Sequence, residues 1–413
     1  MRGEKENKLE VKYGLPFRVQ FCKKCIISNQ RPVPSVEFRY QKNSKKDAIF
    51  FDSQGICQAC RYAEAKAQTI NWKSRYEELA ALCDKHRSKA GDYDCIVPGS
   101  GGKDSVMAAY ILKSKFGMHP LTVTWAPHIY TEIGWKNFQK WMMAGYDNIL
   151  FTPNGKIHRL LTRLAFENLL HPFQPFVFGQ RFLGLRIALK YNIPLVFHGE
   201  SPWEYGSANL KESTEKGFRK EYFTYERDKS TVYLGGISTK ELVAKHRVTW
   251  SDLQPYLPLM KNELETFPLK YQFLGYYIPW DPQEAYYCAV EQTGFEVNPE
   301  RTEGTYSKYA SLDDRIDGFH YYTSFIKFGL GRATMDAAQE IRNGKITRDE
   351  GVSLVKKYDG EFPAKYFQEV LEYMNISKDK FYKLIDQGRS PHLWKKHKGK
   401  WILRHAVYKN QKE

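Results

Sequence analysis

The sequence predicts an α/β protein with a parallel sheet, an N-terminal metal-binding segment and a helical C-terminal lobe. Three observations support this fold class. Strand-like and helix-like stretches alternate in the middle of the chain, two Cys-x-x-Cys pairs precede them, and helical patterns without strands follow. We therefore divide the chain into an N-terminal metal-binding domain (1–70), a connecting helix (71–91), a sheet domain (92–250) and a helical C-terminal domain (251–413).

The composition is that of a globular protein outside the membrane. The chain has 413 residues, enough for two or three domains, and 42% of them are hydrophobic. No apolar run approaches the length of a membrane span. The first residues, M-R-G-E-K-E-N-K, are charged and no apolar segment follows them. We expect a cytoplasmic protein without membrane contact, in which free thiols persist.

The chain is basic, with a formal net charge of +16. This charge suits RNA, an anionic membrane surface or an anionic substrate. The densest basic cluster runs from Lys395 to Arg404 and alternates with Trp394 and Trp401. We interpret this cluster as a solvated tail, and nucleic acid is not the expected partner.

Four cysteines in the first 70 residues have the spacing of a metal site. Cys22 and Cys25 form one Cys-x-x-Cys pair, and Cys57 and Cys60 form the other. Four thiolates make a closed tetrahedral zinc site, which contributes folding energy and has no open position for catalysis. Strand-like stretches at 36–40 and 48–52 could form a hairpin that brings the pairs together. An iron–sulfur cluster and four free thiols are the alternatives.

The sheet domain shows four strand patterns with helices between them. The strands are predicted at 94–98, 120–125, 148–152 and 194–198, and the helices at 105–116, 134–145, 156–170 and 179–191. Strands that alternate with helices favour a parallel sheet covered on both faces. Ligands of such sheets bind at the carboxyl ends of the strands.

A glycine-rich turn between the first strand and its helix is the strongest functional signal. The turn reads G-S-G-G-K-D-S from Gly99 to Ser105. A strand, a glycine turn and a helix N-terminus together favour an anion. The Walker A pattern would need a glycine at Val97 and a hydroxyl at Asp104, and the dinucleotide pattern would need a glycine at Asp104. Both patterns therefore fail.

Two further strand ends carry candidate ligand-binding residues. Val123, Thr124 and Trp125 end the second strand, and His198-Gly199-Glu200-Ser201 follows the fourth. Gly199 would let a ligand approach the backbone, and Glu200 could meet magnesium or substrate. His198 is either a catalytic residue or a histidine at the edge of the core. Gln180 and Arg181 begin a helix near the same edge, where the arginine could hold a phosphate or cap a neighbouring helix.

The C-terminal domain is expected to be helical. Helical patterns cover 283–293, 315–326, 334–342, 348–356 and 363–373. A polar, glycine-rich stretch from Thr305 to Ala337 includes Lys327 and Arg332. Gly329 and Gly331 precede a helix start at Thr334, which again offers an anion site. A salt-bridged loop is the equal alternative.

The turn S-G-G-K-D-S resembles the PP-loop of the ATP pyrophosphatases, which split ATP into AMP and pyrophosphate. The resemblance implies an adenine nucleotide alpha hydrolase-like sheet domain, with an N-terminal zinc-ribbon-like segment before it. It also implies an ATP site whose residues we list here: Gly99, Ser100, Gly101, Gly102, Lys103, Asp104, Ser105, Val123, Thr124, Trp125 and Gly199. Asp104 would hold magnesium, and the second strand end would face the adenine.

Together, the two cysteine pairs, the S-G-G-K-D-S turn, V-T-W, H-G-E-S, K-Y-A-S-L-D-D and F-I-K-F-G-L-G-R-A-T resemble the N-acetyl sugar amidotransferase family. These enzymes act in the biosynthesis of bacterial surface sugars, including pseudaminic-acid-type sugars and the acetamidino sugars of O-antigen lipopolysaccharide. The resemblance implies an enzyme that adenylylates an acetamido oxygen and replaces it with nitrogen from ammonia. The implied catalytic residues are Lys103, Asp104, Glu200, Lys327 and Arg332. The implied cofactors are ATP, Mg²⁺ and Zn²⁺.

The resemblance also implies a separate glutaminase subunit that supplies ammonia. An N-terminal glutaminase would carry a cysteine directly after the initiator methionine, where Arg2 stands. Cys83 and Cys95 read as buried core residues, so Cys288 is the one cysteine left. A tRNA-modifying PP-loop enzyme is the rival interpretation, although sulfur transfer typically uses a cysteine pair that is missing here. A non-catalytic nucleotide-binding scaffold is the third, and the intact Lys103 and Asp104 argue against it.

Overall fold

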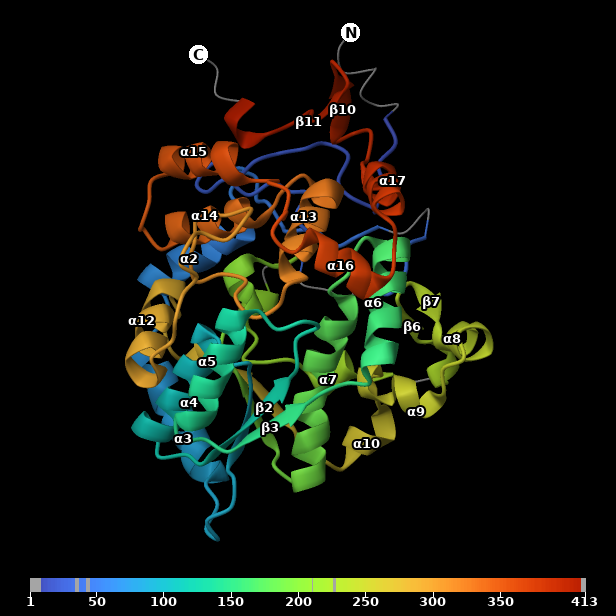
Figure 1. Cartoon of the computed structure of the whole chain (residues 1–413). Coiled ribbons are helices and arrows are strands. Elements are labelled where there is room, and N and C mark those ends of the chain that lie inside the picture. The colour runs from blue at the N-terminus through green and yellow to red at the C-terminus, as the bar shows by residue number, and fades with distance from the viewer. Residues whose placement is uncertain (1–8, 34–36, 42–44, 210, 226–227, 410–413) are drawn as a thin grey trace.

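The computed structural model describes residues 9–33, 37–41, 45–209, 211–225 and 228–409, and at its centre lies a five-stranded parallel sheet (Figure 1). The strand order is β3-β2-β1-β4-β9. The strands are β1 (Cys95–Pro98), β2 (Pro120–Trp125), β3 (Asn148–Phe151), β4 (Leu195–His198) and β9 (Lys270–Phe273). Every neighbouring pair is parallel. The predicted parallel sheet is confirmed.

The first four strands form where the sequence predicts them. β2 is buried along its whole length, and Cys95, Ile96 and Val97 of β1 are buried too. Such continuous apolar runs are typical of a sheet that is covered on both faces. The fifth strand, β9, lies beyond residue 250, so the sheet reaches into the segment that the sequence assigns to the helical domain.

Helices cover both faces of this sheet. They are α3 (Trp72–His86), α4 (Lys103–Tyr110), α5 (Glu132–Met143), α6 (Gly155–Leu169) and α7 (Gln174–Tyr191), and a π-helical turn (Ile111–Lys115) extends α4. β2 and β4 lie on opposite sides of β1. Because crossovers between parallel strands are right-handed, α4 and α7 pack on opposite faces. α4 contacts β1 and β4, and α7 contacts β2, β1 and β4.

Short elements fill the chain between β4 and β9. The strands are β5 (Thr224–Tyr225), β6 (Tyr233–Leu234), β7 (Ile237–Ser238) and β8 (Leu259–Met260). The helices are α8 (Thr239–Lys245), α9 (Trp250–Leu253) and α10 (Lys261–Glu265), with 3₁₀ turns at Pro202–Tyr205, Glu212–Thr214, Lys220–Phe223, Lys229–Thr231 and Gln254–Tyr256. After β9 comes α11 (Leu274–Tyr277).

The C-terminal lobe is helical, as predicted. Its helices are α12 (Pro282–Thr293), α13 (Asp317–Phe328), α14 (Arg332–Arg342), α15 (Arg348–Tyr358), α16 (Phe367–Met374) and α17 (Lys378–Gly388). The basic segment near the end, predicted as a tail, is instead a hairpin of β10 (Trp394–His397) and β11 (Lys400–Leu403), followed by a 3₁₀ turn at Val407–Lys409. Trp394 is buried in the lobe, which anchors the hairpin, while Lys395 and Lys396 stay exposed.

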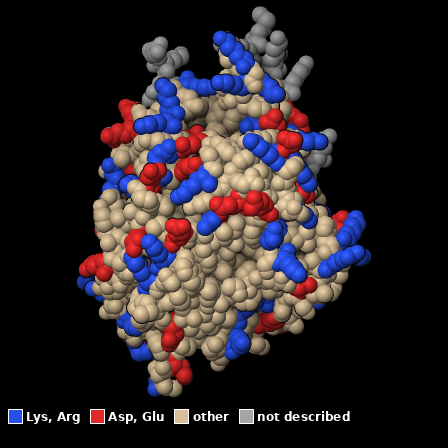
Figure 2. Space-filling model, in the orientation of Figure 1, with Lys and Arg blue, Asp and Glu red and all other residues tan. Residues whose placement is uncertain are grey.

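The charged residues of the molecule are spread over its surface. Figure 2 shows both signs interspersed on one face, with Lys and Arg gathered at the end of the molecule that carries β10 and β11. Mixed signs on the rest of this face favour a solvated surface over one dedicated nucleic-acid track.

The N-terminal segment folds against the C-terminal lobe. Its helix α2 (Gln58–Gln68) begins at the second cysteine pair. All four cysteines share one hydrophobic cluster with Ala337 and Ala338 of α14 and with Val352 and Val355 of α15. The first and last parts of the chain therefore bury a common core.

The hairpin predicted from 36–40 and 48–52 does not form in the described part of this segment. Isolated bridges join Pro32 to Ala48 and Phe51 to Cys57 instead. Glu37 turns inward to pair with Lys46 and Lys327. With Glu37 held inward by these ion pairs, the segment does not alternate between apolar inward and polar outward residues as a hairpin strand would.

Among the described helices, none has both the length and the apolar character that a membrane-crossing segment requires.

Candidate active site

The candidate site lies where the order of the strands reverses. β1 is followed by β2 on one side, and β4 lies on its other side. The carboxyl ends of β1 and β4 therefore open into one crevice, which is the usual ligand position of such sheets. The turn from Gly99 to Asp104 leaves β1 there, and Gly199 and Glu200 leave β4.

Close packing determines the shape of the glycine turn. Gly101 has φ +81°, and a Cβ on it would lie 2.7 Å from Cβ of Trp141 on α5. The Gly99 amide donates to the Val123 carbonyl at 2.9 Å, and the Thr124 hydroxyl donates to the Gly99 carbonyl at 2.7 Å. The turn is thus held from β2 and α5, and only glycine satisfies the backbone at residue 101.

The helix that follows the turn offers its N-terminus to a ligand. α4 begins at Lys103, and its N-cap residue, Gly102, has no side chain to bond the first amides. These amides and the helix dipole favour an anion at this point. The anion-binding geometry expected from the sequence is therefore present.

Gly199 allows the two strand ends to approach each other. A Cβ on this residue would lie 2.7 Å from the backbone oxygen of Asp104. Any larger residue would push β4 away from the start of α4. The glycine therefore brings Glu200 close to the turn, as predicted from H-G-E-S.

A cavity of about 390 Å³ opens over these strand ends. Of the predicted ATP-binding residues, it is lined by Gly99, Ser100, Gly102, Asp104, Ser105, Val123, Trp125 and Gly199. Val123 and Trp125 face it because they alternate along β2 with Thr122 and Thr124. Glu200, His198, Gln180 and Arg181 also line it. The rest of the wall is largely aromatic, with Tyr205, Phe218, Tyr222, Phe223, Tyr271 and Phe273.

Two carboxylates, those of Asp104 and Glu200, line this cavity. Trp280 Nε1 donates to Asp104 Oδ1 at 2.8 Å, and Lys103 contacts the other oxygen. The Tyr205 hydroxyl donates to Glu200 Oε2. Burial and the Asp104 charge raise the pKa of Glu200 to about 7, against the opposing effect of Lys103. Glu200 can thus exchange a proton near neutral pH.

Arg181 and His198 are half-buried and line the same cavity. Burial lowers the pKa of His198, although the Asp104 charge opposes this effect. Arg181 donates to the Tyr222 hydroxyl and lies over its ring at 4.2 Å. Burial also lowers the pKa of Arg181. Both residues stay candidates for contact with a ligand.

A second cavity of about 170 Å³ lies on the other side of the turn, toward the C-terminal lobe. Ser100 to Asp104 line it from the sheet domain, and Asp313 and Arg332 line it from the lobe. Arg332 Nε lies 2.9 Å from Asp336 Oδ1, and its guanidinium lies 4.4 Å from the Tyr321 ring. Lys103 and Arg332 thus bring two cations to the turn, which suits a polyanionic ligand.

The structure brings most of the predicted site residues together and leaves Lys327 outside. Lys103, Asp104, Glu200 and Arg332 surround the turn. Lys327 is only 2% exposed and donates to Glu37 Oε2 at 2.8 Å, to the Tyr40 hydroxyl at 2.9 Å and to the Leu169 carbonyl at 3.0 Å. It lines neither cavity. Its predicted catalytic role is not supported, because its three donors are used within a buried joint.

Sequence reasoning missed two residues that orient the carboxylates, Tyr205 and Trp280. Tyr205 lies five residues after Glu200 in a 3₁₀ turn, so its proximity along the chain was a usable signal. Trp280 lies between α11 and α12, in a stretch that reads only as rich in proline and aromatics. No sequence pattern links it to Asp104.

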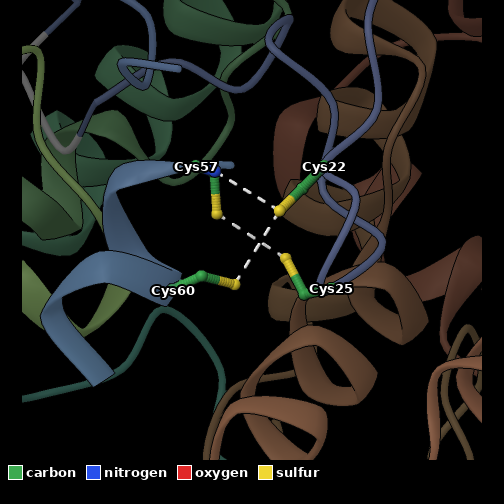
Figure 3. A group of neighbouring side chains, drawn as sticks. All are labelled: Cys22, Cys25, Cys57 and Cys60. Atoms are coloured by element: carbon green, nitrogen blue, oxygen red, sulfur yellow. Dashed lines mark hydrogen bonds between the residues drawn. The ribbon is translucent and has the colours of Figure 1, made fainter. Parts of the chain in front are cut away.

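The four cysteines converge as predicted. Their sulfur atoms all lie within 4.8 Å of one another, and they point toward one centre (Figure 3). Sγ of Cys22 and Cys60 are 3.8 Å apart, and Sγ of Cys25 and Cys57 are 3.6 Å apart. One tetrahedral ion with bonds of about 2.3 Å needs sulfur separations of roughly 3.8 Å. The cysteines can therefore hold a single metal ion such as zinc, whereas an iron–sulfur cluster would spread them further apart.

A family match covers the part of the chain that supplies Arg332. Residues 303–408, about a quarter of the chain, match the family described as "LPS biosynthesis protein WbpG-like, C-terminal domain". This match confirms, for the C-terminal lobe, the resemblance to enzymes of surface-polysaccharide biosynthesis. Asp313, Lys327 and Arg332 all lie inside the matched region.

The chain is also similar to an uncharacterized protein of Methanocaldococcus jannaschii, with 33% identity over 78 residues. The similarity covers 19% of this chain and about a quarter (27%) of the archaeal protein.

Two solved structures are similar to this chain at low identity and low TM-score. NMN synthetase from Francisella tularensis is 12% identical with a TM-score of 0.31, over 76% of this chain and 96% of that protein. The U34-tRNA thiolase NcsA from Methanococcus maripaludis, solved with its [4Fe-4S] cluster, is 13% identical with a TM-score of 0.27, over 83% of this chain and all of that protein.

Proposed function

We propose, from the premise that residues 303–408 form a WbpG-like C-terminal domain, that this protein is an ATP-dependent amidotransferase of surface-polysaccharide biosynthesis. Its substrate would be an N-acetyl sugar or sugar nucleotide, and its product an acetamidino sugar, AMP and pyrophosphate. The observation that carries the proposal is the position of Arg332. This residue of the matched domain lies at the S-G-G-K-D-S turn, beside Lys103.

The nucleotide would lie across the two cavities. The base and ribose fit the larger cavity, between Val123 and Trp125 on one side and α7 on the other. The terminal phosphates would bind at the N-terminus of α4, with Lys103 and Arg332 as counter-charges. A magnesium ion bound to Asp104 would neutralise charge that develops on the leaving pyrophosphate.

The first chemical step forms a bond between the acetamido oxygen and the α-phosphorus. The bond from that phosphorus to the bridging oxygen breaks, and pyrophosphate leaves toward the turn. Pyrophosphate carries the developing negative charge, which the α4 amides, Lys103 and Arg332 are placed to stabilise. The protein orients the weakly nucleophilic amide oxygen, so no protein nucleophile is needed.

The second step exchanges oxygen for nitrogen. Ammonia attacks the activated carbon, and the carbon–oxygen bond then breaks to release AMP. Ammonia must lose protons as the new carbon–nitrogen bond forms. Glu200 is the carboxylate at the cavity whose pKa of about 7 suits it to accept one. The amidino group retains the nitrogen.

The source of ammonia is a separate glutaminase subunit in this proposal. All seven cysteines lie in the described residues, and none lines either cavity at the turn. Four surround the metal position, Cys83 and Cys95 are buried in the core, and Cys288 lies on α12. This distribution provides no cysteine pair at the site, which also counts against the rival tRNA thiolation.

Isotope transfer tests the reaction directly. The protein is incubated with MgATP, heavy-nitrogen ammonium and an N-acetyl sugar nucleotide whose acetamido oxygen is a heavy isotope. We expect heavy nitrogen in the sugar and heavy oxygen in AMP, both measured by mass spectrometry. Pyrophosphate release that requires tRNA and ignores every N-acetyl sugar would overturn the proposal.

A further inference from the structure

Lys66 of the N-terminal segment contacts residues that lie next to the candidate active site. Lys66 lies on α2, the helix whose N-cap residue is Cys57 and which contains Cys60. Its Nζ donates to both carboxylate oxygens of Glu204, at 2.7 and 3.0 Å, and to the backbone oxygen of Trp280 at 3.1 Å. All three donors of the ammonium are thereby used.

The two residues that Lys66 contacts, Glu204 and Trp280, are each connected to one carboxylate of the site. Glu204 directly precedes Tyr205, whose hydroxyl donates to Glu200. Trp280 donates its indole N–H to Asp104. Lys66 therefore anchors both residues that orient the predicted magnesium ligand and the predicted proton acceptor.

The Lys66–Glu204 pair is shielded from water. The Glu204 side chain is 2% exposed and that of Lys66 is 13% exposed. A pair buried to this degree is held in one geometry, and removing one partner leaves an uncompensated charge. It can thus act as a rigid joint, unlike an exposed salt bridge.

Arg342 is a second residue that connects Glu204 with the cysteine site. Arg342 ends α14, and its Nη2 donates to the Glu204 backbone oxygen at 3.1 Å. Burial acts to lower the pKa of Arg342, and negative charge on Cys25, Cys57 and Cys60 raises it above its usual value. Its Nε and Nη1 are buried without a hydrogen-bond partner in the described structure. They are available to a negatively charged four-thiolate metal centre.

The same helix continues to the other side of the turn. α14 begins at Arg332, which lines the second cavity, and ends at Arg342. With about 1.5 Å per residue, its eleven residues span roughly 16 Å. The C-terminal end of α14, at Arg342, therefore lies near the cysteine site, and Arg332, the proposed phosphate-binding cation, lies at its N-terminal end.

We propose that Lys66, Glu204 and Arg342 form a positioning network through which the metal site fixes Asp104, Glu200 and Arg332 for MgATP. The network bonds the backbone of Trp280 and includes Glu204, the residue before Tyr205, so its three members are positioning residues. The inference rests on the proposed function only for the identity of the nucleotide. Its test therefore uses nucleotide binding and metal content, which require no sugar chemistry.

The main test is the double substitution Lys66→Met with Glu204→Gln. It removes both buried charges together, so the protein is expected to fold and to keep its metal. We expect the dissociation constant for MgATP to rise about tenfold, measured by calorimetry, because Asp104 and Glu200 lose their orientation. Adenosine, which does not need the carboxylates, should bind with unchanged affinity.

Two further variants separate positioning from general stability. Lys66→Arg retains the charge and several donors and should recover most of the MgATP affinity. Glu64→Gln is the matched control on the same helix, since Glu64 pairs with Lys24 and Arg61 at the surface. It should leave MgATP affinity and metal content unchanged.

The outcomes are decisive in both directions. The network is overturned if the double variant binds MgATP as tightly as the wild type, or if MgATP and adenosine weaken equally. Loss of metal from the double variant would also overturn it, because the proposal places the network downstream of an intact metal site. A wild type that binds no MgATP at all would instead refute the proposed function.

Discussion

Two buried lysine–glutamate pairs join the N-terminal segment to the rest of the chain, and they differ in where they lead. Lys66 pairs with Glu204, next to residues that hold the active-site carboxylates. Lys327 pairs with Glu37 and is surrounded by Tyr40 and the Leu169 carbonyl, away from both cavities. The sequence predicts a catalytic lysine at 327 and says nothing of Lys66. The chemistry of a side chain thus does not locate a site unless its neighbours are known.

The electrostatics of the two pairs also differ. Burial raises the pKa of Glu204, and Lys66 lowers it by less. Burial also tends to raise the pKa of Glu37, but Lys327 and Lys46 together hold it well below its usual range. Burial lowers the pKa of Lys327 to about 8, against the effect of Glu37. The Glu37 joint is therefore the more strongly compensated of the two.

The largest loss of activity is expected when the carboxylate of Asp104 is removed from the glycine turn. Asp104→Ala removes the predicted magnesium ligand and should lower kcat/KM for pyrophosphate release about 10³-fold. Metal content and melting temperature should stay near wild type, because Asp104 is partly exposed and far from the cysteines in the chain. A variant with wild-type turnover would rule out the site at this turn.

The next test replaces Arg332 and Lys327, the two predicted catalytic cations of the C-terminal lobe, one at a time. Arg332→Met should reduce kcat/KM about 10²-fold, since it removes one counter-charge from the turn. Lys327→Met should leave turnover of the folded enzyme within about twofold and reduce the unfolding free energy by about 3 kcal/mol, because the buried Glu37 loses one of its two lysine partners. Steady-state kinetics and urea unfolding measure the two effects. Equal kinetic losses would contradict the placement of Arg332 at the turn and of Lys327 in a buried joint away from it.

The last prediction concerns how stability depends on pH at two glutamates, the half-buried Glu200 and the buried Glu37. Glu200 has a folded pKa of about 7, above its unfolded value, so its contribution to stability is full at low pH and is lost as pH rises from about 4.5 through about 7. The pKa of Glu37 is depressed on folding, so its contribution is present at neutral pH and is lost as pH falls below about 4.5.

Substitution by glutamine should remove each dependence separately. Glu200→Gln should stabilise the protein relative to wild type at pH 8, by up to about 3 kcal/mol, and by little at pH 4. Glu37→Gln should destabilise it at pH 7 more than at pH 4. Urea midpoints at several pH values measure both trends. Parallel curves for the two variants would contradict the assigned pKa directions.

The sequence predicts the sheet well because local patterns carry the information. Strands β1 to β4 are apolar runs between helices with clear caps, such as Thr131 for α5 and Asn154 for α6. Gly101 and Gly199 are required by close approach of backbone, so the turn and H-G-E-S are readable as motifs. β9 was missed because its residues, K-Y-Q-F, form no continuous apolar run and lie among proline and aromatic residues.

The site is less predictable because it is assembled from distant segments. Trp280 reaches Asp104 across 176 residues, and Lys66 reaches Glu204 across 138. Such contacts leave no local periodicity. Lys327 and Arg332 illustrate the limit, since both stand in the same glycine-rich block and only the tertiary packing of α13 and α14 separates them.

The shared core of the cysteines has a consequence for how the protein is made. Val407, six residues from the end of the chain, lies in the same hydrophobic cluster as Cys22 and Cys25. Because the chain is synthesised from its N-terminus, the four cysteines leave the ribosome before Val407, so this shared core forms only after residue 407 has been made. Contacts of such long sequence separation are slow to form. If the four thiols bind a metal ion early, the nascent N-terminal segment would stay ordered and its sulfur atoms protected until the 3₁₀ turn at Val407–Lys409 docks.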